Sequence, residues 1–164
     1  MNAEYVRKLL LVEDSPGDAR LIAEILNRIG DIEMVTASTL SEALEYLREQ
    51  QWDVILMDLG LPDSEGIETL EKVQTISQKA CVVVLTGIES EEIGTQSIRQ
   101  GADDYLVKGY VDERALSASL RYAVERKNAR EVLEESELNM AKAQSIAHVG
   151  SWEWDISRYA LYWS

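Results

Sequence analysis

The sequence predicts an α/β fold built on a parallel sheet. Over about the first 125 residues, short apolar runs alternate with segments whose apolar residues recur every three or four positions. Continuous apolar runs are typical of strands buried on both faces, and the longer spacing is typical of helices that pack on a sheet. Polar residues also follow several of the apolar runs, where a strand would end. Repeated strand–helix units of this kind imply a parallel sheet with helices on both faces.

The predicted elements follow one another along this region. The strands are expected at residues 9–12, 32–36, 54–57, 82–85 and 105–107. The helices are expected at about residues 16–29, 38–50, 67–76 and 91–100, and from about 112 onward. Ser15 before Pro16 is typical of an N-cap followed by the first helical position, and Gly30 and Gly101 lie where helices should end. Residues 59–66 are rich in turn formers and predict a loop.

The composition changes near residue 121. From Arg121 to about Ala147 there is no glycine or proline, and charged residues and alanine dominate. This pattern predicts that the last helix continues as a long exposed rod. A weak seam along it is compatible with a coiled-coil homodimer, and a single solvated helix or frayed linker is the alternative. The seam consists of Tyr122, Ala129, Leu133, Ser136, Met140 and Ala143.

The tail differs from everything before it. Three of the four tryptophans, Trp152, Trp154 and Trp163, lie in the last thirteen residues. Their alternation with polar residues predicts the start of a β-rich module, and too little sequence follows to complete one. We therefore expect a globular domain at residues 1–127, a helical linker at 128–147 and the partial start of a second domain at 148–164.

Charge and composition restrict the class of protein. The net charge of −14 argues against binding to nucleic acid or to an anionic membrane surface, and it favours a divalent cation or a cationic partner. The single cysteine, Cys81, excludes an internal disulfide and is consistent with a reducing compartment. No signal peptide is apparent, and no apolar run approaches the roughly 18 residues that span a bilayer. The expected location is the cytoplasm.

One chemical site is predicted at the ends of the strands. Glu13 and Asp14 follow the first strand, Asp58 the third, Thr86 closes the fourth, and Lys108 follows the fifth. In an open parallel sheet, ligands bind at this carboxyl edge. A carboxylate can attack phosphorus to form an acyl phosphate, and Mg²⁺ prefers oxygen ligands. Three carboxylates, a hydroxyl and an ammonium therefore predict a metal site beside a phosphorylatable group.

These residues, in their local context, resemble the receiver domain of two-component response regulators. The resemblance covers about Lys8 to Lys127, and its matching segments are LLLVEDSPGDAR, VILMDLGLPDSEG, VVVLTG and DDYLVKG. It implies a flavodoxin-like (βα)5 fold, with strand order 2-1-3-4-5 and here an extended C-terminal helix. The tail, from AKAQSIAHVG onward, resembles the opening of a PAS sensory domain.

The resemblance assigns roles at the predicted site. Asp58 would accept a phosphoryl group. Glu13, Asp14, Asp58 and the backbone carbonyl of Gly60 would hold Mg²⁺, and Lys108 would pair with the phosphoryl group. Gly60 also argues against one competing enzyme class, because phosphatases of the haloacid dehalogenase type need a second aspartate at that position.

Two further residues would form the switch that such domains use. Thr86 would hydrogen-bond to the phosphoryl group, and Tyr105 would turn from an exposed to a buried position. Thr86 could instead be only a helix cap, and Tyr105 could be an ordinary packed tyrosine. Receivers usually have proline after the lysine, joined by a cis bond. Here Gly109 follows Lys108, so a cis bond is not expected.

The predicted function is signal reception in a phosphorelay. A sensor histidine kinase or phosphotransfer protein would donate the phosphoryl group, and the altered conformation would regulate a C-terminal output or a partner. Slow loss of the phosphoryl group would be the only other chemistry, so the chain would not be an enzyme in the usual sense. A stand-alone regulator that acts by protein–protein binding is the alternative. A kinase within this chain is disfavoured, because its one histidine, His148, does not lie on an acidic helix.

Overall fold

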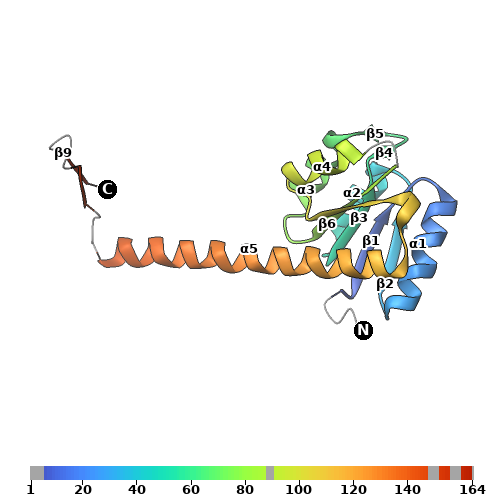
Figure 1. The fold of residues 1–164 in the computed structure, drawn as a ribbon, viewed down its shortest axis with the longest axis horizontal. Coiled ribbons are helices and arrows are strands. Elements are labelled where there is room, and N and C mark those ends of the chain that lie inside the picture. Colours follow the sequence, from blue (N-terminus) through green and yellow to red (C-terminus); the bar gives the residue numbers. More distant parts are fainter. Residues whose placement is uncertain (1–5, 88–90, 148–151, 156–159, 164) are drawn as a thin grey trace. The chain divides into compact units, whose positions relative to one another are not determined.

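A five-stranded parallel sheet forms the centre of the computed structural model, which describes the backbone of residues 6–87, 91–147, 152–155 and 160–163 (Figure 1). Its strands lie in the order β2-β1-β3-β6-β7. They are β1 (Lys8–Val12), β2 (Glu33–Ala37), β3 (Val54–Asp58), β6 (Cys81–Thr86) and β7 (Asp104–Val107). Counted without the two short strands β4 and β5, this is the order 2-1-3-4-5, so the predicted flavodoxin-like fold is confirmed.

The helices follow the strands in the predicted alternation. They are α1 (Pro16–Ile29), α2 (Leu40–Glu49), α3 (Ile67–Ile76), α4 (Glu91–Arg99) and α5 (Glu113–Ala147), with a short 3-10 turn, η2, at Lys108–Tyr110. Ser15 caps α1 by accepting a hydrogen bond from the Asp18 amide at 3.3 Å, and Pro16 occupies the first turn. Asp112 caps α5 by accepting one from the Ala115 amide at 2.7 Å.

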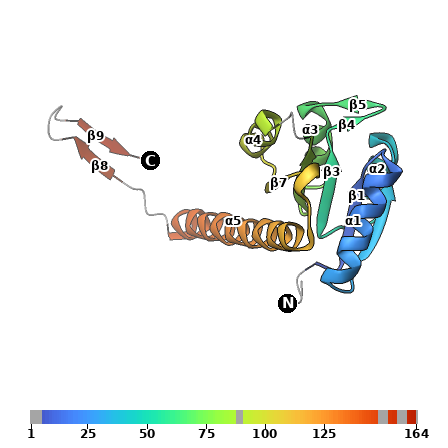
Figure 2. The ribbon, with the colours of Figure 1, turned by 45° about the vertical axis from the view of Figure 1, so that its right-hand side comes forward.

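Two apolar layers enclose the sheet. One face carries buried residues of α1 and α5, and the other carries those of α2 and α3 with partly buried Ile98 of α4 (Figure 2). The three central strands, β1, β3 and β6, are nearly inaccessible, and all six residues of β6 are buried. This double burial explains why the strands are continuous apolar runs rather than alternating ones.

The register of the sheet aligns the strand ends that carry polar residues. Val12 pairs with Met57, Asp58 pairs with Leu85, and Thr86 pairs with Val107. The residue after each of these strands is therefore delivered to one edge. Glu13 extends β1 by donating its amide to the carbonyl of Ala37 at 2.9 Å.

Residues 59–66 differ from the predicted loop. They contain a small antiparallel hairpin, β4 (Gly60–Leu61) with β5 (Ser64–Glu65), around the turn at Pro62 and Asp63. A turn of two residues favours pairing of its flanks, and burial of Leu61 anchors the hairpin to the core. The Asp63 carboxylate accepts hydrogen bonds from the amides of Leu40 and Ser41 at 2.8 and 2.9 Å, so the hairpin also caps α2.

The C-terminal part of the chain forms a second compact unit. The chain divides into two compact units, Met1–Lys127 and Asn128–Ser164, and α5 is continuous through the boundary. The predicted extension of the last helix to Ala147 is confirmed. Within the second unit, β8 (Trp152–Asp155) and β9 (Ala160–Trp163) pair as an antiparallel hairpin. His148 of the PAS-like motif lies outside the described residues.

The two cationic residues at the end of the first unit attach α5 to neighbouring loops. The Arg126 guanidinium donates a hydrogen bond to the carbonyl of Asp103 at 3.2 Å, and the Lys127 ammonium donates one to the carbonyl of Gln78 at 3.4 Å. Fully buried Leu116, Leu120 and Ala123 hold the same stretch of helix on the sheet. Among the described residues, no helix is long and apolar enough to traverse a bilayer.

Candidate functional site

Three carboxylates converge at the carboxyl edge of the sheet. Glu13 and Asp14 come directly after β1, and Asp58 is the last residue of β3. One carboxylate oxygen of each lies within 4.8 Å of those of the other two. Their environments differ, since Glu13 is buried, Asp58 is half-buried and Asp14 is exposed. The parallel pairing of β1 with β3 produces this cluster from residues more than forty positions apart.

One ammonium neutralises part of this charge. Lys108 leaves β7 at the start of η2, and its Nζ lies 2.5 Å from Asp58 Oδ2 and 2.7 Å from Glu13 Oε2. It also lies 3.3 Å from Oδ2 of Asp18 in the first turn of α1. The backbone reaches this position without a cis peptide bond among the described residues. Lys108 thus joins the ends of three strands and one helix.

Burial and charge shift the ionisation of this group of residues. Burial raises the pKa of the Glu13 carboxyl above 4.5, and a hydrogen bond from Lys108, one from the Ser15 amide and the Lys108 charge only partly oppose it. Burial by itself would lower the pKa of the Lys108 ammonium, but hydrogen bonds and charges from Asp58 and Glu13 outweigh it and raise that pKa. The lysine therefore stays charged and the buried glutamate depends on it.

The donor set fits a hard divalent cation. Carboxylate oxygens from three residues within 4.8 Å match the ligands that Mg²⁺ takes, and the exposed Asp14 leaves room for the waters that Mg²⁺ retains. Glu13 Oε2 is fully buried and lies 2.7 Å from the Lys108 ammonium, and a carboxylate oxygen in such an ion pair still has a lone pair that can coordinate a cation. Gly60 donates its amide to Asp58 Oδ1 at 2.9 Å and places no side chain over that oxygen.

The predicted switch residues flank this cluster. Thr86 ends β6 and is buried, and its hydroxyl donates a long hydrogen bond, 3.5 Å, to the carbonyl of Leu106. Tyr105 lies in β7, half-buried, and its ring packs against the core beneath α4. Among the described residues, no hydrogen bond joins either side chain to a carboxylate of the cluster. Among the residues that the structure describes, the Thr86 hydroxyl has one hydrogen-bond partner, the backbone carbonyl of Leu106.

Two acids outside the cluster, Asp53 and Asp103, have structural roles. Asp53 accepts the amides of Arg7 and Lys8, both at 2.8 Å, and buried Asp103 accepts the amide of Val82 at 2.8 Å. Asp18 is the exception that sequence reasoning missed. Its place in the first turn of a helix that begins at the carboxyl edge was the available signal, because that turn points back at the strand ends.

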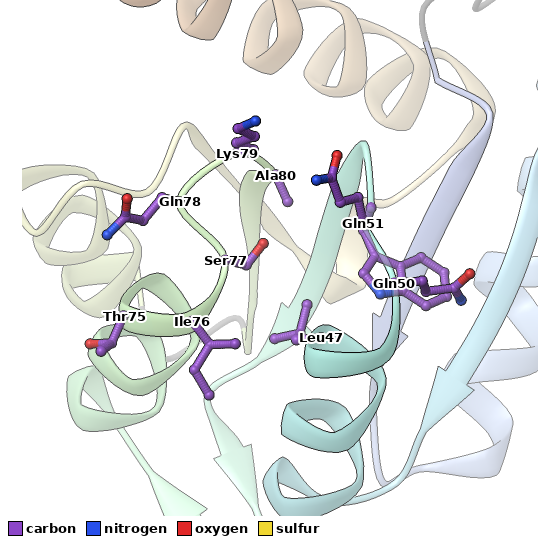
Figure 3. A pocket seen from close by; sticks show the side chains of 10 residues that line it. Leu47, Gln50, Gln51, Thr75, Ile76, Ser77, Gln78, Lys79 and Ala80 are labelled. Carbon is purple, nitrogen blue, oxygen red and sulfur yellow. The ribbon is translucent and has the colours of Figure 1, made fainter.

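A separate hollow lies at the opposite edge of the sheet. Its volume is about 290 Å³, and it lies between the segments that precede β3 and β6, around Leu47, Trp52, Ile76 and Ala80 (Figure 3). Its described lining contains glutamine, serine, threonine and one lysine but no carboxylate. It therefore does not belong to the acidic cluster.

The family assignment follows from a match over most of the first unit. The family model described as "Response regulator receiver domain" matches residues 9–121, which include the three clustered carboxylates, Thr86 and Lys108. The chain belongs to this family. It is a receiver domain that takes part in phosphorelay signalling, and receiver domains are phosphoacceptor switches that interact with histidine kinases or phosphotransfer proteins.

Individual relatives support the assignment of this receiver. It is 26% identical over 111 residues to the chemotaxis protein CheY of Bacillus subtilis (strain 168), a match that covers 68% of this chain and 92% of that protein. It is 30% identical over 108 residues to the transcriptional regulatory protein ZraR of Klebsiella oxytoca, covering 66% of this chain but only 24% of ZraR. The receiver thus spans most of CheY and about a quarter of ZraR.

Solved structures agree with the fold. A receiver domain protein from Clostridium thermocellum is 27% identical, with a TM-score of 0.66, over 76% of this chain and 98% of that one. A receiver domain protein described as CheY-like, from Methanospirillum hungatei JF-1, gives the same identity and TM-score. These matches identify the first unit as a complete receiver fold.

Proposed function

We propose that Asp58 accepts a phosphoryl group from a histidine kinase or phosphotransfer protein in a reaction that depends on Mg²⁺. The observation that supports this most strongly is the shared ammonium. Lys108 lies within 2.7 Å of both Asp58 and Glu13, while Asp14 completes a cluster of oxygens 4.8 Å across. Such a site combines a nucleophile, a fixed positive charge and a set of metal ligands.

The chemistry follows from these groups. A carboxylate oxygen of Asp58 would form a bond to phosphorus as the bond from phosphorus to the donor imidazole nitrogen breaks, leaving an acyl phosphate and a free histidine. Glu13, Asp14 and Asp58, with the Gly60 carbonyl, would hold Mg²⁺. When bound, the ion supplies positive charge that offsets repulsion between donor and carboxylate. Lys108 would stabilise the phosphoryl oxygens from the other side.

The conformational response is assigned to Thr86 and Tyr105. The weak hydrogen bond that now holds the Thr86 hydroxyl is easily exchanged for one to a phosphoryl oxygen. Tyr105, two residues before the last residue of β7, Val107, would then favour its buried position. Phosphorylation would shift the populations of two states that both exist beforehand.

The output is assigned to the segment after the receiver. We assign residues 1–127 to the receiver, 128–147 to a signalling helix and 148–164 to the start of a PAS-like domain. The tryptophan-bearing hairpin of β8 and β9 is compatible with such a start. A stand-alone regulator that acts only by protein–protein binding is not favoured over this arrangement. The activity and partners of any larger protein belong to the same proposal.

The helix also offers a surface for homodimerisation. Large apolar side chains at Leu133 and Met140, two positions of the predicted seam, are 59% and 63% exposed. Their spacing of seven residues is the coiled-coil repeat. We therefore assign α5 of a second copy of the chain as the partner of α5. Association would be measured as the molar mass in solution, with and without beryllofluoride.

Phosphorylation of the intact chain tests the main proposal. The protein is incubated with acetyl phosphate and Mg²⁺, and the mass gain of one phosphoryl group is located by peptide mass spectrometry. Wild type should be modified at Asp58, and the reaction should stop when EDTA removes the metal. Asp58→Asn should remain unmodified, while Asp53→Asn, an acid with a structural role, should react. Equal modification of Asp58→Asn would refute the assignment.

A further inference from the structure

Gly94 occupies a position in α4 where the backbone does not require glycine. Among the described glycines, positive φ angles are found at Gly66 and Gly101, not at Gly94. In a helix interior, glycine is less favourable than alanine, because it loses more backbone freedom on folding. Gly94 is also buried, whereas its neighbours Ile93 and Thr95 are exposed. The reason for glycine must therefore lie in what faces it.

The ring of Tyr105 fills the space that a side chain would need. A Cβ added at Gly94 would lie 2.4 Å from Cδ2, 2.7 Å from Cε2 and 2.8 Å from Cγ of Tyr105, all closer than real Cβ contacts. Cγ is the root of the ring, so a small tilt of the ring tip cannot relieve the clash. Either the ring must rotate away about χ1 or α4 must move off the sheet.

This contact fixes where the tyrosine ring lies. Tyr105 pairs with Val84 in the sheet, and its half-buried ring packs on the core cluster on one side and on the α4 backbone on the other. The bare backbone at Gly94 thus forms one wall of a slot that matches an aromatic ring. Buried Ser97, one turn later, is also small and folds its hydroxyl back onto the Ile93 carbonyl at 2.7 Å.

We propose that Gly94 is a positioning residue for Tyr105: its bare backbone forms the slot that admits the ring to the half-buried position against α4. Any side chain at Gly94 disfavours that position and drives the ring toward solvent. The inference rests on the proposed function for its regulatory meaning, since Tyr105 matters there as a switch. The packing of the Tyr105 ring against Gly94 can be measured without phosphorylation.

The packing is tested by Gly94→Ala in two backgrounds. In the wild-type background the added methyl should lower the melting temperature, because it clashes with the ring. In a Tyr105→Ala background the same change should raise it, because alanine favours the helix and the ring that the methyl would meet is gone. This reversal of sign is not expected from a role in helix stability alone. Thr95→Ala, on the exposed face of α4, is the matched control and should show no reversal.

The position of the ring is tested by nitration with tetranitromethane, resolved by peptide. Tyr110 is 73% exposed and serves as the internal reference. The ratio of Tyr105 to Tyr110 modification should rise several-fold in Gly94→Ala and stay constant in Thr95→Ala. A melting temperature that rises in both backgrounds, together with an unchanged nitration ratio, would overturn the inference.

Beryllofluoride binding separates this inference from the proposed function. If the buried ring belongs to the phosphorylated state, Gly94→Ala should weaken beryllofluoride binding by about threefold or more, and the change should vanish in the Tyr105→Ala background. Wild type that fails to bind beryllofluoride would overturn the proposed function, while melting and nitration still decide the slot. Wild type that binds, with Gly94→Ala binding equally well, would overturn the regulatory meaning of Gly94.

Discussion

Replacing Lys108 with methionine should destabilise the receiver strongly at neutral pH. The Lys108 ammonium lies 2.7 Å from Glu13, whose side chain is fully buried, and 2.5 Å from half-buried Asp58. At an effective dielectric constant of 20, one such contact corresponds to about 6 kcal/mol of gross attraction, most of which desolvation offsets. Removing one partner of a buried pair typically costs about 3–5 kcal/mol. Because Lys108 keeps 23% exposure, we expect about 3 kcal/mol.

The loss should depend on pH in a defined direction. Burial raises the folded-state pKa of Glu13 above its value in the unfolded chain. A carboxyl whose pKa is raised by folding binds its proton more tightly in the folded state. Its contribution to folding stability is therefore complete below the pKa of the unfolded chain and is lost as pH rises through the pKa of the folded state. Without Lys108 that pKa rises further, because the ammonium was lowering it. The deficit of Lys108→Met should therefore be smaller near pH 5 than near pH 8.

The assay is urea unfolding of both proteins in EDTA across this pH range. Glu13→Gln is the control, since it removes the buried charge. In the Glu13→Gln background, Lys108→Met should cost much less, which measures the coupling between the two residues. If Lys108→Met is as stable as wild type at pH 8 in EDTA, the ion pair between Lys108 and Glu13 does not stabilise the fold.

Three further outcomes are expected. Asp18→Asn should change the free energy of unfolding by less than about 1 kcal/mol, because Asp18 is 45% exposed, but it should raise beryllofluoride affinity two- to fivefold by freeing Lys108; unchanged binding would count against sharing of the lysine. Asp63→Ala should cost about 1 kcal/mol in urea unfolding through loss of the α2 cap, and since backbone hydrogen bonds from Ser41 and Leu40 lower the pKa of Asp63, this difference should shrink as pH falls below 3.8. Leu120→Ala should cost about 2–5 kcal/mol, measured the same way, since Leu120 is fully buried on the sheet; a loss under 1 kcal/mol would contradict the packing of α5.

Much of the fold could be predicted because its signals are local. A strand such as Val54–Asp58 is buried on both faces and is therefore a continuous apolar run, and Ser15 with Pro16 specifies a helix start by its own chemistry. The hairpin inside residues 59–66 could not be predicted, because two-residue strands have no periodicity. Their pairing depends on burial of Leu61 and on the cap that Asp63 supplies to a distant helix.

The candidate site shows the same division. Strand ends predicted that three carboxylates, the Thr86 hydroxyl and the Lys108 ammonium should meet. The carboxylates of Glu13, Asp14 and Asp58 do cluster, and Lys108 contacts two of them. The Thr86 hydroxyl is instead hydrogen-bonded to the carbonyl of Leu106. The contact of Asp18 with Lys108 depends on the angle at which α1 leaves β1, and that angle is set by tertiary packing. The slot at Gly94 also could not be predicted from the sequence, because the sequence does not show that the ring of Tyr105 faces this glycine.

The two outer strands limit how copies of this sheet can join. β2 at one end has only five residues and exposes Glu33 and Thr36, and β7 at the other has four and begins with Asp104. Short borders that carry charge are poor templates for intermolecular strand addition, which protects against amyloid-like stacking. Self-association of the receiver unit should therefore use its helical surfaces rather than pairing of the outer strands of the five-stranded sheet.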